Sequence, residues 1–173
     1  NGSIIHYNPN SNNKRLTQGE LYLCDSGAQY YEGTTDVTRT IHLGNKKPKK
    51  EFIENYTRVL MGHIDLAKMI FPLGTTGSQL DSIARYYLWK NGLDYEHGTG
   101  HGVGSFLGVH EGPQSISKNL SNVKLEEGMI LSNEPGLYKK KKYGIRIENL
   151  ILVVKSKYKG FLEFKTLTLF PYE

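Results

Sequence analysis

The chain has 173 residues, of which 38% are hydrophobic and 23% charged, a composition that is ordinary for one globular domain with its own core. The net charge of +5 comes from short lysine runs that we place in turns, and no aromatic residues interleave with them, which argues against nucleic-acid binding. The sequence also lacks an apolar run long enough for a transmembrane helix, and its one cysteine excludes an internal disulfide or a cysteine-based zinc site.

The first predicted element is a short strand at residues 4–6, where two isoleucines precede His6. Taken alone, His6 is typical of a core or turn histidine. The start of the chain does not resemble a signal peptide, and we expect a cytoplasmic protein without a membrane partner.

Residues 21–40, LYLCDSGAQYYEGTTDVTRT, predict a β-hairpin, because an alternating run is followed by a glycine and then by β-branched residues. With the turn centred directly after Tyr30, Asp25 and Asp36 would be direct cross-strand partners, about 4.5–5.5 Å apart at Cβ. Two unpaired carboxylates at this distance repel, so one takes up a proton or a divalent cation bridges them. The alternative is that Asp36 is a turn residue and Asp25 a solvated acid at a strand end.

Two helices are predicted next. The first covers about residues 50–71, because apolar residues recur at helical spacing until Pro72 stops the pattern. The second begins near Thr76 and closes at Gly92. We interpret both helices as scaffold, and His63, within the first, as a surface residue.

Four glycines alternate with other residues in the segment HGTGHGVG, residues 97–104. They forbid a stable helix, so His97 and His101 are not the i, i+4 pair of a helical HExxH zinc site. Their spacing also fails the GxGxxG and P-loop patterns, which argues against nucleotide binding, but it allows close backbone approach to a ligand. His110 follows nine residues after His101. Three of the six histidines therefore lie close together in sequence, which favours a functional cluster.

A second hairpin is predicted in the C-terminal half of the chain. One strand reaches Glu134, and residues 144–154 form the strongest strand pattern of the chain, with an apolar second half that suggests burial on both faces. Glu134 and Glu148 are symmetric about Lys141, so this hairpin could again bring two acids face to face. An isolated buried carboxylate is costly, and the alternative is a buried ion pair between Glu148 and Arg146.

Together the two hairpins offer four carboxylates, and the glycine-rich segment offers an imidazole. This donor set favours a hard or borderline cation such as Mn²⁺. The number of carboxylates suits two cations better than one, because a bridging carboxylate neutralises part of two charges. A dinuclear site supports hydrolysis, but the residues alone do not separate amide from phosphoester substrates. The candidate ligands are Asp25, Asp36, His101, Glu134 and Glu148.

The segments DSGAQYYEGTTDVTRT, HGTGHGVGSFLGVHEGP, NEPGLY and YGIRIEN resemble the signature blocks of the Xaa-Pro aminopeptidase (aminopeptidase P) family of metallopeptidases. The resemblance implies an α+β class with the pita-bread fold of creatinase and methionine aminopeptidase, a curved antiparallel sheet with helices on its outer face. Residues 1–173 would then form one catalytic metallopeptidase domain. Because the family's domain is longer, we expect that its N-terminal part is missing here and that the chain belongs to a larger polypeptide.

The resemblance also implies a role for each candidate metal ligand. Asp25 would bind one Mn²⁺ ion, and His101 and Glu134 would bind the other. Asp36 and Glu148 would bridge the two ions. Glu134 would also be the general base or proton shuttle for the bridging water.

Four further residues would surround these ions. His97 and His110 would contact the substrate and stabilise the transition state, and His6 would line the same pocket. Arg146 would orient Asp25 without touching the metal itself, as residues behind a ligand commonly do. Relatives commonly dimerise, and any homodimer would form through regions outside this chain.

The reaction implied by the resemblance is removal of the N-terminal residue from peptides whose second residue is proline. Proline forms a tertiary amide without an N–H, so a pocket shaped for its ring would accept bonds that general aminopeptidases handle poorly. One alternative is a prolidase-like Xaa-Pro dipeptidase, which requires a free carboxylate on the substrate. Another is a non-catalytic pita-bread binding module, which the loss of metal ligands would signal, and none of the five ligand types is lost.

Overall fold

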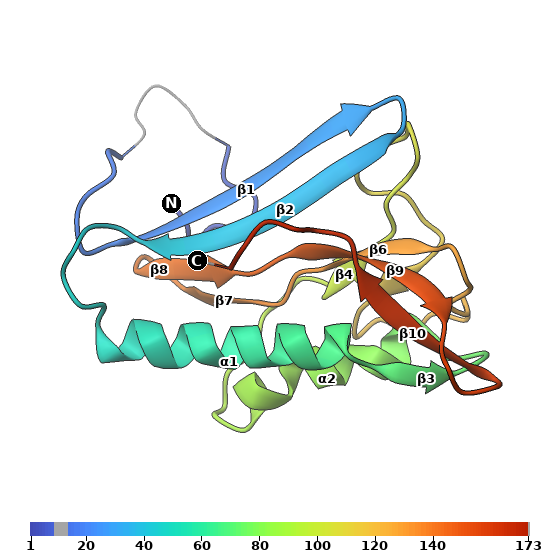
Figure 1. The fold of residues 1–173 in the computed structure, drawn as a ribbon. Coiled ribbons are helices and arrows are strands. Elements are labelled where there is room, and N and C mark those ends of the chain that lie inside the picture. Colours follow the sequence, from blue (N-terminus) through green and yellow to red (C-terminus); the bar gives the residue numbers. More distant parts are fainter. Residues whose placement is uncertain (9–13, 173) are drawn as a thin grey trace.

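The computed structural model describes residues 1–8 and 14–172, which form strands above a pair of helices (Figure 1). The helices are α1 (Lys50–Ala67) and α2 (Gly77–Trp89). The strands are β1 (Leu21–Tyr30), β2 (Gly33–His42), β3 (Ile70–Pro72), β4 (Gly100–His101), β5 (Ser115–Ile116), β6 (Ile130–Asn133), β7 (Gly136–Lys139), β8 (Tyr143–Arg146), β9 (Asn149–Lys155) and β10 (Phe161–Thr166).

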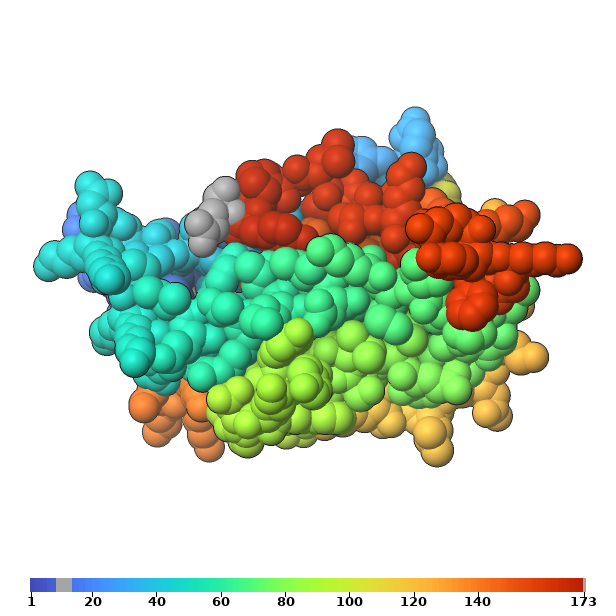
Figure 2. Space-filling model, turned by 60° about the horizontal axis from the view of Figure 1, so that its bottom comes forward, coloured from blue at the N-terminus to red at the C-terminus, as the bar shows by residue number. Residues whose placement is uncertain are grey.

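All strand pairs are antiparallel. Strands β3, β10, β9 and β6 are hydrogen-bonded in that order, β1 pairs with β2, β4 with β5, and β7 with β8. An isolated bridge between Thr38 and Glu148 joins the first hairpin to the junction of β8 and β9. Both helices lie below β1, β2, β7, β8 and β9, with β3 beside the end of α1 (Figure 1), and Figure 2 shows the helices forming much of this face of the molecule. The arrangement confirms the predicted α+β class with helices outside antiparallel strands.

Two hydrophobic clusters fill the space between helices and strands. One includes Leu66 and Leu131 and lies under the four-stranded sheet, and the other includes Val59 and Ile145 and lies under β7 and β8. Val59 and Leu66 are seven residues apart in α1, which is two helical turns, so one face of this helix serves both clusters. Among the described residues, neither helix is long and apolar enough to cross a membrane.

The two helices pack closely because of one glycine, and the second begins with a capping box. A Cβ at Gly62 of α1 would overlap the carbonyl oxygen of Ala84 in α2, so a side chain here would push the helices apart. α2 begins with a capping box in which Thr76 and Gln79 satisfy backbone N–H groups reciprocally. The second helix therefore starts where the sequence predicted.

The predicted end of the first helix is wrong. α1 ends at Ala67, and Ile70–Pro72 form the edge strand β3, paired with β10. Phe71 is 1% exposed and packs on Phe164 with 4.9 Å between ring centroids. A buried aromatic residue suits a strand as well as a helix, and for this reason Phe71 extended the apparent helical pattern.

The predicted strand at residues 4–6 is also wrong. These residues lie in turns, where the backbone N–H of Ile4 donates to the carbonyl oxygen of Asn1 at 2.8 Å. A Cβ at Gly144 would overlap the carbonyl oxygen of Gly2. The N-terminal segment therefore crosses closely over β8 instead of pairing with it.

His63, predicted to lie on the surface, is fully buried. Asn133 Nδ2 donates to its carbonyl oxygen at 2.9 Å, and its ring lies edge-on to Tyr172 with 5.5 Å between centroids. Neither ring nitrogen has a hydrogen-bond partner among the described residues. Burial, and then the charge of Arg39, lower the pKa of His63 to about 4. The imidazole is therefore neutral at neutral pH.

Acid should weaken the fold through His63. The unfolded chain takes up a proton near pH 6.5 and the folded chain only near pH 4, so the free energy of unfolding falls as the pH drops through this window. We expect this group to contribute a loss of about 2–3 kcal/mol between pH 7 and pH 4.5. The His63→Phe variant keeps a ring against Tyr172 but cannot take up this proton. Its loss of stability between the two pH values should therefore be smaller by this amount. Urea unfolding of both metal-free proteins at the two pH values measures the difference, and equal losses would contradict it.

Candidate metal centre

The first hairpin brings Asp25 and Asp36 to one face, but not into direct opposition as predicted. Asp25 pairs with Thr38 and Asp36 pairs with Gly27, because the turn is centred one residue later than predicted. Side chains alternate along a strand, so an offset of two residues keeps both aspartates on the same face. Such diagonal neighbours lie about 7–8 Å apart, which is close enough to share bound ions.

The second hairpin has the predicted register. The pairings of β6 with β9 and of β7 with β8 are symmetric about Lys141, so Glu134 and Glu148 come opposite each other between the two ladders. The predicted continuous strand over residues 144–154 is interrupted at this point. The backbone N–H of Glu148 donates instead to the carbonyl oxygen of Thr38 at 3.0 Å. This bond joins the two acid-bearing hairpins.

His101 on β4 reaches the same place. Its Nε2 lies 3.5 Å from Asp36 Oδ2 and 3.2 Å from Glu134 Oε1. One ligand atom from each of Asp36, His101 and Glu148 lies within 4.8 Å of the others. Residues from four strands or strand junctions, far apart in sequence, therefore converge on one point.

The glycine-rich segment forms no helix, as predicted. Backbone from other segments packs directly against two of its glycines. A Cβ at Gly100 would overlap the carbonyl oxygen of Ser132, and one at Gly102 would overlap that of Glu111. At these two positions the close approach is to the protein's own chain rather than to a ligand. It allows β4 to lie directly against β6 and so brings His101 to the acids.

Glu148 experiences the charge of the other three acids. It is 1% exposed, and burial, followed by the charges of Glu134 and Asp36, raises its pKa well above the ordinary value. Thr38 opposes this shift by donating its hydroxyl to Glu148 Oε2 at 2.6 Å, whereas Asp25 adds to the repulsion. The four carboxylates are thus close enough to affect one another's protonation.

His101 supplies positive charge among these acids in the metal-free protein. Burial lowers its pKa, but hydrogen bonds to Asp36 and Glu134 outweigh burial and raise the pKa to about 10. Burial likewise raises the pKa of Glu134, yet the bond to His101 holds it below the ordinary value. A divalent cation would replace this proton and bind the neutral imidazole. The donor set therefore fits a metal ion.

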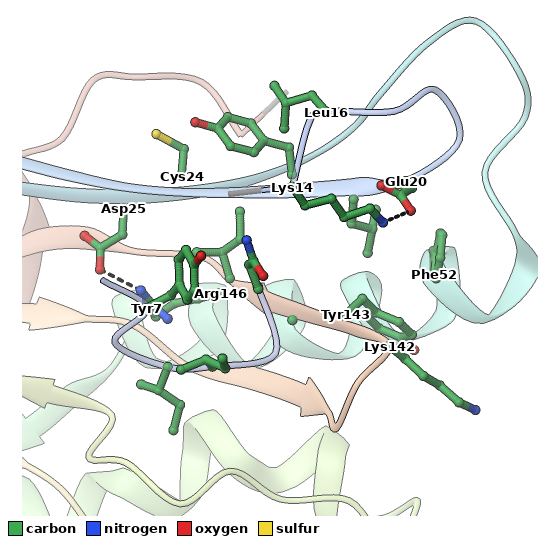
Figure 3. A pocket seen from close by; sticks show the side chains of 18 of the residues that line it. Tyr7, Lys14, Leu16, Glu20, Cys24, Asp25, Phe52, Lys142, Tyr143 and Arg146 are labelled. Atoms are coloured by element: carbon green, nitrogen blue, oxygen red, sulfur yellow. Dashed lines mark hydrogen bonds and ion pairs between the residues drawn. The ribbon is translucent and has the colours of Figure 1, made fainter. Parts of the chain in front are cut away.

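A chain of hydrogen bonds connects Asp25 to His97. Arg146 is 2% exposed and donates Nη2 to Asp25 Oδ2 at 2.6 Å (Figure 3) and Nη1 to the Tyr138 hydroxyl at 2.8 Å. That hydroxyl lies 2.8 Å from His97 Nε2, and Nδ1 of the same ring lies 2.7 Å from the carbonyl oxygen of Gly98. Nδ1 faces a carbonyl and must donate. Because burial lowers the pKa of His97, its ring is neutral, and Nε2 accepts a hydrogen bond from the Tyr138 hydroxyl.

Tyr138 is a residue of the site that the sequence did not predict. Its cross-strand partner is Gly144, and an aromatic residue opposite a glycine is the one signal that could have indicated a ring lying over the strand pair. Burial raises the pKa of Tyr138 to about 12, so its hydroxyl keeps its proton and remains a donor. This residue links Arg146 to His97, two residues that nothing in the sequence connects.

The other two candidate histidines meet the site from different elements. His6 lines a cavity of about 1040 Å³ together with Asp25 and Arg146, part of which is shown in Figure 3. His110 packs edge-on against His101, with 4.2 Å between the ring centroids. His97 and His110 are not among the described residues that line this cavity. His6 thus shares a cavity with Asp25, whereas His110 contacts His101. His97 is linked to Asp25 through Tyr138 and Arg146.

Three kinds of similarity connect this chain to known proteins. The pattern of metallopeptidase family M24 matches residues 1–155. Xaa-Pro aminopeptidase 1 of Dictyostelium discoideum is 51% identical over 179 residues, which cover 100% of this chain and 28% of that protein.

Solved structures show the same similarity. An X-prolyl aminopeptidase from Caenorhabditis elegans, described as a cytosolic enzyme with a di-nuclear active site, matches with a TM-score of 0.93 and 49% identity over 98% of this chain and 28% of that one. Prolidase from Pyrococcus furiosus matches with a TM-score of 0.84 and 34% identity, over 98% of this chain and 47% of that one. The chain spans less than a third of the length of the aminopeptidases.

Chelation should destabilise the protein, because the clustered carboxylates then face one another without a cation. With Mn²⁺ at about 100 times its Kd, we expect a melting temperature about 5–10 °C above that in excess chelator. Glu148→Gln should reduce this difference. Glu127→Gln, which changes an exposed acid paired with Lys155, should preserve it. A wild-type melting temperature unaffected by chelator would contradict a cation site.

Proposed function

The chain belongs to metallopeptidase family M24, and we propose that it carries the catalytic centre of a metal-dependent aminopeptidase that releases the N-terminal residue from peptides with proline in second position. The observation that carries the proposal is the convergence of Asp36, His101 and Glu148, with their ligand atoms within 4.8 Å of one another. Sequence identity of about 50% to Xaa-Pro aminopeptidases over nearly the whole chain supports the reaction class.

Two divalent cations, most simply Mn²⁺, would bind the five candidate ligands. Asp25 would hold one ion, His101 and Glu134 the other, and Asp36 and Glu148 would bridge them. Oxygen donors with one imidazole suit such ions. When bound, a pair of divalent cations lowers the pKa of water and polarises a carbonyl oxygen.

The residues of the chain would hold and move the protons. Glu134 is the candidate general base: its Oε1 accepts the Ser132 hydroxyl at 2.9 Å and lies 3.2 Å from His101 Nε2, beside the other candidate ligands. It would take a proton from the attacking water and return it to the proline nitrogen of the departing peptide. Arg146 would keep Asp25 in place through the 2.6 Å bond.

His97, His110 and His6 would contact the peptide. His110 packs against His101, and His97 Nε2 accepts a hydrogen bond from the Tyr138 hydroxyl, which fixes the orientation of the His97 ring. Such groups stabilise charge that develops on the peptide in the transition state. His6 would contribute from the cavity wall near Asp25.

A prolidase-like dipeptidase is the second candidate, favoured by the match to the Pyrococcus furiosus prolidase. The two reactions differ in the substrate's carboxylate, which a dipeptidase requires beside the scissile bond and an aminopeptidase does not.

The cytoplasmic location remains a prediction, and so does a homodimer that forms through regions outside this chain. The Caenorhabditis elegans protein is described as cytosolic.

A metal titration separates these reactions. The full-length protein should hydrolyse a peptide of four or more residues with proline second once Mn²⁺ is added, and should leave the matched alanine peptide nearly untouched. The longer peptide should be cleaved at least as well as an Xaa-Pro dipeptide. Cleavage of the dipeptide alone would instead identify a dipeptidase, and no metal-dependent cleavage of either peptide would refute both.

Asp36→Asn and Glu148→Gln should each abolish hydrolysis, because either change would remove a carboxylate proposed to bridge two ions. The expected loss is about 10³-fold or more in kcat. Glu127→Gln is the matched control and should retain full activity. Near-normal turnover in either site variant would defeat the dinuclear assignment.

His110→Ala should lower turnover by roughly 10²-fold while leaving the metal content unchanged. The reason is that His110 packs on the His101 ring and is proposed to contact the substrate rather than to bind an ion. Metal analysis of the purified variant provides the check. Loss of metal on this substitution would make His110 a ligand and would contradict its proposed role.

A further inference from the structure

A fully buried arginine in α2 donates hydrogen bonds to three backbone or side-chain groups of the loop that follows the helix. Arg85 is 0% exposed, and its Nη1 donates to Asp94 Oδ1 at 2.7 Å and to the carbonyl oxygen of Tyr95 at 2.6 Å. Its Nη2 donates to the carbonyl oxygen of His97 at 2.8 Å. The guanidinium also lies 3.8 Å from the centre of the Tyr95 ring. One side chain thus fixes the path of the loop that carries His97.

Asp81, one turn earlier in α2, fixes the other end of the same loop. Its Oδ2 accepts from Arg85 Nε at 2.6 Å, and its Oδ1 accepts from the Thr99 hydroxyl at 2.5 Å. Thr99 is fully buried, and its hydroxyl also lies 2.6 Å from that of Tyr95. The carbonyl oxygen of Thr99 accepts the backbone N–H of Glu134 at 2.7 Å. The buried ion pair is therefore connected to both a candidate substrate-binding histidine and the candidate base.

Stability alone accounts poorly for this network. A buried ion pair is often no more stabilising than apolar side chains of the same volume, because both charges lose their hydration. Its geometric effect is different. Arg85 and Asp81 together hold backbone or hydroxyl groups of Tyr95, His97 and Thr99. These bonds set where the His97 ring meets the Tyr138 hydroxyl.

We propose that the buried Asp81–Arg85 pair is a positioning device that holds His97, and through Thr99 the base Glu134, in the geometry required for turnover. The turnover part of this proposal rests on the proposed aminopeptidase function. The positioning part does not, because the His97 ring has a signature of its own. Its Nδ1 faces the Gly98 carbonyl and its Nε2 faces the Tyr138 hydroxyl, so the neutral ring carries its proton on Nδ1.

Arg85→Lys tests the proposal most sharply. Lysine keeps the positive charge beside Asp81 but lacks the fork that reaches the His97 carbonyl at the same time. Nitrogen NMR of the metal-free protein should show the Nδ1–H form of His97 in the wild type and its loss in the variant. In the metal-loaded full-length enzyme, kcat on the proline peptide should fall about 10–100-fold, with KM and metal content changed little. Lys118→Ala removes only the exposed partner of Asp94 and should change neither the His97 signal nor kcat.

The outcomes separate the two proposals. An unchanged His97 signal and unchanged kcat in folded Arg85→Lys would overturn the positioning role. If Arg85→Lys does not fold, Thr99→Val tests the opposite end of the loop, with Thr99→Ser as the conservative rescue, and an unchanged His97 in Thr99→Val overturns the role equally. A changed His97 signal in a protein whose wild type does not cleave proline peptides would support the positioning role and refute the proposed reaction.

Discussion

The repulsion among four carboxylates is the constraint on which the arrangement of this molecule depends. Glu148 is almost fully buried, and the charges of Glu134, Asp36 and Asp25 all raise its pKa. Burying an acid beside other acids is unfavourable unless a positive charge lies among them. A proton on His101 serves this purpose in the metal-free protein. Divalent cations would serve it better, since each carries two charges and accepts several oxygen ligands at once.

Two arginines and a threonine hydroxyl donate hydrogen bonds to the acids or to the backbone beside them. Arg146 donates to Asp25, and Arg39 donates to the backbone carbonyl of Glu148 at 2.6 Å and to the Asn149 side chain at 2.7 Å. Thr38 donates its hydroxyl to Glu148 from the neighbouring hairpin. These groups orient the carboxylates, and Arg146 Nε also lies 3.9 Å from Glu134 Oε2. The interruption between β8 and β9 at Glu148 is part of the same arrangement, because it directs the glutamate's backbone to Thr38.

Much of this could be predicted from sequence, and the misses have physical causes. The symmetry of Glu134 and Glu148 about Lys141 indicated the second hairpin, whereas the first hairpin was misplaced by one residue because neither Tyr30 nor its neighbours carry a strong turn preference. His63 shares the helical face of buried residues at Val59 and Leu66. Its spacing indicated burial, and its polar side chain was weighted too heavily. The contacts of Arg85 depend on the path of the loop that follows α2, and Tyr138 meets a histidine from a distant part of the sequence, and no local pattern reveals either.

Anomalous scattering from crystals of the full-length protein grown with Mn²⁺ tests most directly whether cations hold these acids together. We expect two anomalous peaks about 3.5–4 Å apart, one beside Asp25 and the other beside His101, with Asp36 and Glu148 between them. A single peak, or peaks away from these carboxylates, would contradict the assignment and leave the buried Glu148 to be explained by protonation alone.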